Sequence, residues 1–219
     1  MTKIVVSNLY QKENLSHMVQ DYIKDLILRG IYKEGTRVLE TELAEQLGIS
    51  RGPVREAIKT LEQRGILTVE ARKGAYVTCF DDNDVQEVFE IRLLLENSIL
   101  EELINNEILT EEDFRALDQN VDEMIAIVES DEPYEEKVLA VNKKDIEFHQ
   151  YLWARSGSKR KEHMLNDLFF QLRLAMLYDT RVTEDLMRTA TDHNEIIKYL
   201  RAGDLANSKK ALEDSIITM

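Results

Sequence analysis

Cysteine, proline and glycine are all scarce in this sequence of 219 residues, which has one Cys, two Pro and eight Gly. The single cysteine, Cys79, excludes a disulfide-stapled scaffold and is typical of a reducing environment, so we expect a cytoplasmic protein. No apolar run approaches the roughly 18 residues that span a bilayer, and the apolar stretch near the start is too short for a secretory signal. These absences, together with 43% hydrophobic residues, favour a globular and mainly α-helical protein that does not enter a membrane.

Charge is distributed unevenly along the chain, whose formal net charge is −14. Residues 1–78 carry 12 basic and 10 acidic side chains, whereas residues 79–219 carry 16 basic and 32 acidic ones. An acidic chain is a poor nucleic-acid binder on average, but a near-neutral segment can bind phosphates if its positive charges share one face. The asymmetry therefore predicts two parts with different tasks.

The first third of the chain begins with two predicted helices. We expect residues 1–15 to be a flexible lead-in. From Ser16 to about Arg29, apolar residues recur at helical spacing and predict the first helix. A short second helix follows a glycine-containing loop and ends at Gly48, since glycine commonly ends a helix.

A third helix and a hairpin complete this part. The hydroxyl of Ser50 can cap the third helix, and Pro53 falls in its first turn, where the missing N–H costs nothing. Residues 66–80 predict two short strands about a turn that contains glycine. Residues 16–78 are therefore expected to form a winged helix-turn-helix domain.

Beyond a linker at residues 79–83, we predict an all-α antiparallel helical bundle over residues 84–219. Thr110 and Thr183, each followed by acidic residues, are expected to cap two of its helices. The expected helices cover residues 84–106, 111–130, 134–156, 159–180, 183–202 and 204–217. The predicted fold class is mainly α, a winged helix-turn-helix followed by the bundle.

Basic side chains mark one face of the third helix. Arg51, Arg55 and Lys59 are each four residues apart and so share a face. Arg51 and Arg55 lie in the first turns, the end of a recognition helix that enters the major groove of DNA. Arg72 and Lys73 lie at the tip of the hairpin, where they can reach a neighbouring groove or the backbone. The alternative is a solvated helix whose charges only keep the protein soluble.

A longer string resembles the DNA-binding signature of GntR-type bacterial transcription regulators. It reads GTRVLETELAEQLGISRGPVREAI over residues 35–58, and LEQRGIL and GAYV continue the match over residues 61–67 and 74–77. The resemblance covers about residues 16–78. It implies contacts with double-stranded DNA at the following residues: Ser50, Arg51, Pro53 and Arg55, supported by Arg37, Arg72 and Gly74.

Within the predicted bundle, Asp145 and His149 are four residues apart and can point at one metal ion from one helix. A further histidine, His193, lies on a later helix, and antiparallel packing could bring it beside the first two. Alternatively, each histidine is an ordinary surface residue or a satisfied core residue.

The second part of the chain also resembles a family, the FCD-type effector domain of the FadR branch, over about residues 84–217. The matching features are Ile91-Arg92 with Glu96, the Asp145–His149 pair, Ser156-Gly157, His193 and the run from Arg201 to Asp204. The resemblance implies a divalent metal, zinc or nickel, held by one Asp and three His, of which Asp145, His149 and His193 match. The fourth position is Ser215, whose hydroxyl is a much poorer ligand than imidazole. His163 matches no ligand of the family.

Effectors of this domain type are often small carboxylic acids, as the resemblance implies. A buried arginine can hold a carboxylate through two hydrogen bonds, and we name Arg92 first and Arg173 second. Ser215 is grouped with them as an effector-binding residue. The alternative for each arginine is a structural ion pair with a neighbouring acid.

We therefore predict a homodimeric transcription regulator, not an enzyme, whose affinity for a DNA operator responds to a small effector, with metal assistance as an option. A homodimer is expected because one recognition helix covers too few base pairs for specificity. Two alternatives remain open. One is a DNA-binding dimer that has lost metal sensing, and the other is a metal-dependent hydrolase at the Asp145, His149 and His193 site.

Overall fold

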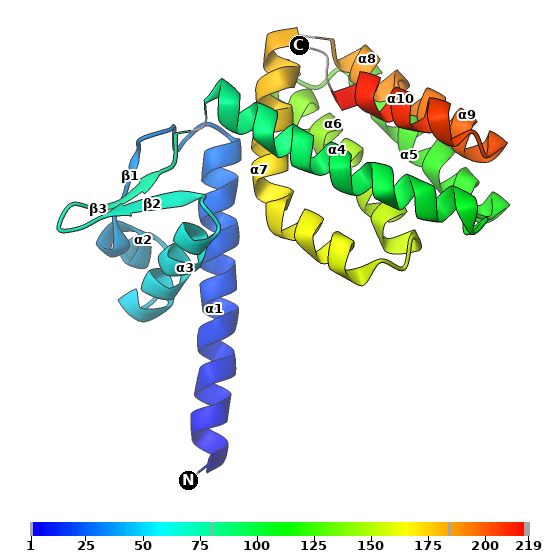
Figure 1. Ribbon diagram of the computed structural model, residues 1–219. Coiled ribbons are helices and arrows are strands. Elements are labelled where there is room, and N and C mark those ends of the chain that lie inside the picture. The colour runs from blue at the N-terminus through cyan, green and yellow to red at the C-terminus, as the bar shows by residue number, and fades with distance from the viewer. Residues whose placement is uncertain (1, 80, 184, 217–219) are drawn as a thin grey trace. The chain divides into compact units, whose positions relative to one another are not determined.

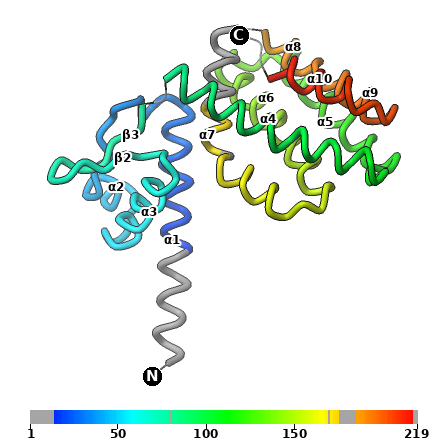
Figure 2. Tube along the Cα trace, viewed as in Figure 1, coloured from blue at the N-terminus to red at the C-terminus, as the bar shows by residue number. Residues whose placement is uncertain are grey.

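The computed structural model describes residues 2–79, 81–183 and 185–216, and for residues 2–13, 169 and 175–183 it describes the backbone alone (Figure 2). Parts of the predicted segments, namely Met1 and residues 80, 184 and 217–219, lie outside this range. The chain divides into two compact units, Met1–Asp81 and Asp82–Met219. We call these the N-terminal and C-terminal units and describe each by itself.

The N-terminal unit consists of three helices and a small sheet (Figure 1). Its elements are α1 (Thr2–Leu28), β1 (Arg37–Val38), α2 (Glu40–Gln46), α3 (Arg51–Gln63), β2 (Leu67–Glu70) and β3 (Gly74–Val77). The sides of α1 and α3 that pack together bury aliphatic residues at helical spacing, among them Val19, Ile23, Val54 and Leu61. This core fixes α3 so that its opposite face is exposed.

The three strands form an antiparallel sheet in the order β1-β3-β2. Strands β2 and β3 are the predicted hairpin, with Leu67 opposite Val77 and Glu70 opposite Gly74. The two-residue strand β1 was not predicted, because two residues are too few to show alternation. It places Arg37 opposite Tyr76 on the far side of β3 from β2.

The structure changes two details of the sequence prediction for this unit. Helix α1 begins at Thr2 rather than Ser16, so the expected lead-in at residues 1–15 is largely helical backbone. The prediction used the apolar stripe, which is regular in the sequence from Ser16 onward. Ser50 is the N-cap residue of α3, as expected, but its hydroxyl makes no capping hydrogen bond.

Among the residues that the structure describes, the regular elements of the C-terminal unit are all helices (Figure 1). Its helices are α4 (Asp82–Asn105), α5 (Glu111–Glu129), α6 (Tyr134–Arg155), α7 (Lys159–Thr183), α8 (Leu186–Thr191), α9 (His193–Ala202) and α10 (Leu205–Ile216). Helix α6 packs against α4, α5, α7 and α8, and α10 packs against α4 and α9. This arrangement brings side chains from α4, α6 and α9 into one interior.

One expected helix, at residues 183–202, is divided into α8 and α9 at Asp192. The ring Nδ1 of His193 donates to the carbonyl oxygen of Thr189, 2.9 Å away. In a continuous helix the backbone N–H of His193 would use this carbonyl. The cap also differs from the prediction, since α7 extends to Thr183 and the side chain of Asp185 caps α8. The predicted cap at Thr110 forms a complete capping box with Asp113.

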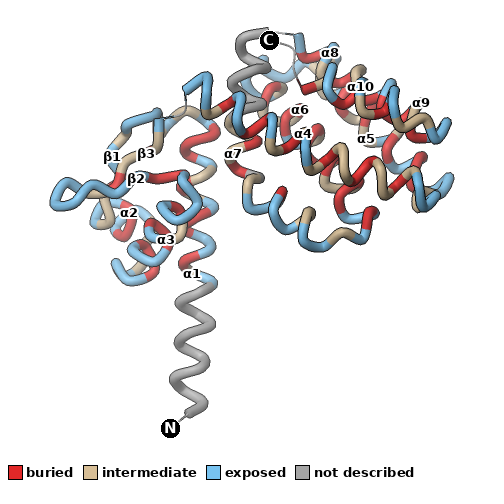
Figure 3. The backbone as a smooth tube through the Cα atoms, in the orientation of Figure 1, coloured by how far each residue is buried: buried red, intermediate tan, exposed pale blue. Residues whose placement is uncertain are grey.

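Buried residues follow the packed sides of the helices in both units (Figure 3). In α4 the apolar stripe contains two charged residues, Arg92 and Glu96, and both are buried. Burial of charge is costly unless each group is paired, so these two positions point to a polar site inside the bundle. Among the described residues, no helix has both the length and the apolar character needed to cross a membrane.

Candidate functional site

The exposed face of α3 carries the basic residues predicted to meet DNA. The side chains of Arg51 and Arg55 are 58% and 64% exposed, and Lys59 is exposed one turn further along. Because the opposite face of α3 is buried in the core, these three side chains point into solvent. Such a face can approach phosphates and base edges without any rearrangement of the core.

A carboxylate that we did not single out from the sequence links the two arginines. Glu40, the first residue of α2, accepts hydrogen bonds from Arg55 Nε at 3.2 Å and Arg55 Nη2 at 3.1 Å. It also accepts one from Arg51 Nη2 at 3.2 Å. The hydrogen bonds from Arg55, and then the one from Arg51, outweigh burial and hold the pKa of Glu40 below its usual value of 4.5, so the carboxylate stays charged. No periodicity signals this contact, because Glu40 precedes the arginines by 11 and 15 residues.

Two residues at the start of α3 differ in how much surface they present. Ser50 is exposed and its hydroxyl is not used by the helix, so it is accessible to a phosphate beside the helix N-terminus. Pro53 is buried, which leaves it little surface for the DNA contact that the family resemblance implied. Its fixed φ instead suits the first turn of α3.

The hairpin brings together the remaining predicted DNA-binding residues. Gly74 has φ +113°, and a Cβ added there would lie 3.3 Å from Nε of Arg37. The side chain of Arg37 therefore lies close to the start of β3, and the positive φ at this position favours glycine. Arg72 is exposed at the tip with φ 66°, and Lys73 Nζ lies 2.7 Å from Glu70 Oε2 within the hairpin.

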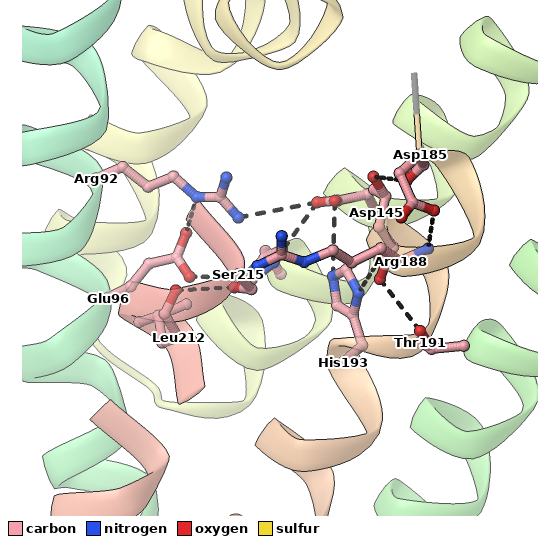
Figure 4. Close-up of polar contacts among 11 residues, drawn as sticks. Arg92, Glu96, Asp145, Asp185, Arg188, Thr191, His193, Leu212 and Ser215 are labelled. Atoms are coloured by element: carbon pink, nitrogen blue, oxygen red, sulfur yellow. Dashed lines mark hydrogen bonds and ion pairs between the residues drawn. The ribbon is translucent and has the colours of Figure 1, made fainter. Parts of the chain in front are cut away.

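Inside the C-terminal unit, the three predicted metal ligands converge. Figure 4 labels two of them, Asp145 and His193. Asp145 and His149 come from α6 and His193 from the start of α9, and all three are buried. Each offers a ligand atom, and these atoms lie within 4.8 Å of one another. Ligands about 2.1 Å from a zinc ion lie roughly 3.5 Å apart, so an ion needs only a small inward movement of the side chains.

Hydrogen bonds fix how the two imidazole rings face the site. Nδ1 of His149 lies 2.7 Å from Glu96 Oε2, and Nδ1 of His193 lies 2.9 Å from the Thr189 carbonyl oxygen. A carboxylate and a carbonyl accept hydrogen bonds, so Nδ1 is the donor in both rings. Nε2 of each ring then faces Asp145, at 3.5 Å for His149 and 3.7 Å for His193, and offers a lone pair there when the ring carries no second proton. Lone pairs facing a carboxylate attract a cation.

Two buried polar atoms of this cluster lack a hydrogen-bond partner among the described residues, Oδ1 of Asp145 and Nε2 of His193. Burial by itself raises the pKa of Asp145, but the neighbouring His193, His149 and Arg92 stabilise the ionised carboxylate and outweigh burial, so the pKa falls below 3.8. Burial, and then the charge of Arg92, lower the pKa of His149 and favour its neutral form. An ionised carboxylate and neutral imidazoles are the forms that bind divalent metals.

Arg92 and Glu96 complete the buried site. Arg92 Nε donates to Glu96 Oε1 at 2.7 Å, and Arg92 Nη2 lies 3.8 Å from Asp145 Oδ1. Burial raises the pKa of Glu96, but the charge of Arg92, then the neighbouring His149 and the hydrogen bonds from both residues, prevail and lower it to about 2. The prediction had given Glu96 no role. In the sequence it appeared only as a matching feature of the FCD resemblance, four residues after Arg92.

The other predicted residues of the bundle lie around this cluster or away from it. Arg173 Nε donates to Asn142 Oδ1 at 3.3 Å, and Asn142 precedes Asp145 by one turn of α6. The hydroxyl of Ser215 donates to the carbonyl oxygen of Leu212 at 2.8 Å, so it is engaged within α10 (Figure 4). His163 is exposed on α7 beside Asp167 and takes no part in the cluster.

Comparison with known families divides the chain in the same way. Residues 15–77 match the family described as "Bacterial regulatory proteins, gntR family", and residues 87–217 match the FCD domain. Both are families of transcription regulators rather than enzymes.

Individual relatives match most of the chain. It is 29% identical over 182 residues to the uncharacterized HTH-type transcriptional regulator YdhC of Bacillus subtilis, covering 82% of this chain and 77% of the relative. It is 26% identical to the gluconate operon transcriptional repressor of Bacillus subtilis, covering 82% and 73%. It is 30% identical to the Nta operon transcriptional regulator of Aminobacter aminovorans, covering 68% and 67%.

A solved structure shares the fold. Escherichia coli McbR/YncC superposes with a TM-score of 0.72 at 23% identity, covering 92% of this chain and 93% of that one. The two domain matches together span the exposed basic face of α3 and the buried cluster of the bundle. The chain therefore belongs to the GntR family of DNA-binding transcription regulators and carries an FCD domain.

Proposed function

We propose that this transcription regulator binds its operator as a homodimer and that a divalent metal with a small carboxylate effector, bound in the C-terminal unit, modulates operator affinity. The observation that carries the metal proposal is the orientation of the rings. Both His149 and His193 have Nδ1 committed to an acceptor and Nε2 turned toward Asp145. A cation satisfies these groups at once.

For DNA, we propose that α3 is the reading helix, with Arg51, Arg55 and Lys59 facing the major groove. Ser50 and the N-terminus of α3 would contact a phosphate. A second contact with DNA would come from the hairpin, through Arg37, Gly74 and the exposed tip with Arg72 and Lys73. What supports this is the exposure of all these cationic side chains on an otherwise packed unit of near-neutral charge.

For the metal, Asp145, His149 and His193 would be the ligands, and Ser215 would leave a fourth position open. When bound, a zinc or nickel ion supplies a Lewis-acidic position that an anionic ligand can take. Arg92 lies beside Asp145 and would orient a carboxylate through the guanidinium N–H groups that Glu96 does not use. Arg173, which contacts Asn142, is the second candidate for this role.

Calorimetric titration of the intact protein with zinc tests the metal proposal. We expect one site per chain in the wild type and loss of that site in Asp145→Ala and His193→Ala. Ser215→His, which supplies the ligand typical of the family, should tighten binding. A silent titration of the wild type would favour the alternative of a DNA-binding dimer that has lost metal sensing.

The effector and dimer proposals need separate measurements. One relative is named for a gluconate operon, so gluconate belongs in a panel of small carboxylates tested by thermal shift with and without zinc. A stabilising acid should lose its effect in Arg92→Ala. Light scattering should give twice the chain mass of 25.5 kDa, whereas a monomer mass would contradict the dimer.

A further inference from the structure

Glu40 joins the two arginines of α3 into one unit. Its two carboxylate oxygens accept hydrogen bonds from Nε and Nη2 of Arg55, and Oε2 also accepts one from Nη2 of Arg51. The paired contact with Arg55 has the planar geometry that restricts a guanidinium in both position and direction. Both arginines still keep more than half of their side-chain surface exposed, whereas Glu40 is only 27% exposed. The carboxylate therefore restrains the two arginines from the less exposed side and leaves most of their surface accessible.

This arrangement has opposite consequences for two kinds of DNA contact. A base edge needs a guanidinium at a defined position, and a side chain that is already fixed loses less conformational entropy on binding. A phosphate of arbitrary sequence needs only positive charge, and the charge of Glu40 cancels part of that attraction. The same carboxylate thus favours specific contacts and opposes non-specific ones.

We infer that Glu40 is a positioning residue that sets sequence discrimination, because it aims Arg51 and Arg55 at base edges and weakens their attraction to phosphates of any sequence. This inference rests on the proposal that α3 is the reading helix. It goes further by assigning the discrimination to a residue on α2 that reaches the arginines from outside the reading helix.

The test uses the full-length protein and two duplexes, one selected in vitro from a random library by the wild type and one scrambled from it. Glu40→Gln should weaken binding to the selected duplex about 10-fold, as expected for loss of one well-placed base contact. It should also tighten binding to the scrambled duplex several-fold. The slope of log affinity against log salt concentration for that duplex should become steeper by up to about one unit. A purely structural loss would weaken both.

Glu40→Asp separates orientation from charge. It keeps the charge but is one methylene too short to span both arginines, so binding to the scrambled duplex should stay unchanged while binding to the selected duplex weakens. Glu42→Gln is the matched control, because it removes the same charge from an exposed position of α2. It should change both affinities little and by the same factor.

Two outcomes would overturn the inference, and only the second would also overturn the proposal that α3 is the reading helix. If either Glu40 variant changes both affinities by the same factor, α3 can remain the reading helix but Glu40 does not set discrimination. If the wild type selects no sequence from the library, the reading-helix proposal fails and this inference fails with it.

Discussion

The Nδ1–H of His149 donates a hydrogen bond of 2.7 Å to Oε2 of Glu96, which links α6 to α4 in the interior of the bundle. Glu96 is in turn held by Arg92 on the same helix. A carboxylate behind a histidine fixes the ring and makes its other nitrogen a better ligand. Glu96 thus prepares the site without offering it a ligand atom.

Glu96→Gln should lower zinc affinity by about 10- to 100-fold, the range for partners that orient a metal-bound histidine. Competition with a chromophoric chelator measures this. Glu87→Gln removes the same charge from an exposed position on α4 and should leave zinc affinity unchanged. Equal affinities of the Glu96 variant and the wild type would contradict the role of Glu96.

Arg51→Ala and Arg55→Ala should each weaken operator binding about 10- to 100-fold, because a paired contact with a base contributes about 1–3 kcal/mol. Both side chains are exposed, so the melting temperature should stay within about 2 °C of the wild type. Gel-shift titration and thermal melting check the two expectations. Lys33→Ala, an exposed cation in the loop between α1 and β1, is the control and should have little effect. Unchanged affinity in both arginine variants would show that α3 is not the reading helix.

Gly74→Ala should destabilise the hairpin by about 1–3 kcal/mol, since φ +113° is a strained conformation for any residue with a Cβ. The added methyl group would also press on Nε of Arg37 at 3.3 Å and displace its guanidinium. Thermal melting should show the loss of stability, and operator affinity should fall with it. Ala71→Gly in the same hairpin adds flexibility without a clash and serves as the comparison. A fully stable Gly74 variant would argue against this backbone conformation.

Asp113 should make the free energy of unfolding of the C-terminal unit depend on pH in the acidic range. Burial raises its pKa, but hydrogen bonds from Tyr151 and Thr110 and the charge of Arg155 outweigh that effect and lower the pKa from 3.8 to about 2. The folded pKa lies below the unfolded one, so this stabilisation is present above about pH 4 and is lost as the pH falls through about 2. Urea unfolding should find Asp113→Asn less stable than the wild type by up to about 2 kcal/mol at pH 6. The difference should shrink below pH 4, and a difference independent of pH would contradict the assignment.

Much of the fold was predictable because it depends on local patterns. The hairpin, the start of α3 at Ser50 and the cap at Thr110 follow from turn and capping residues that act within a few positions. The division of α8 from α9 at Asp192 was not predicted, and the structure shows the ring Nδ1 of His193 donating to the Thr189 carbonyl there. Strand β1 was missed since its two residues become a strand only by pairing with β3.

The sequence alone determined the family, most of the helices, the hairpin and the residue types that can meet DNA or a metal, since these depend on composition and on spacing along the chain. Only the tertiary structure decided which acids complete each site. Glu40 reaches Arg51 and Arg55 from another helix, and Glu96 reaches His149 across 53 positions. Such contacts form when buried apolar faces pack helices together, and no periodicity in the chain records which polar side chains then meet.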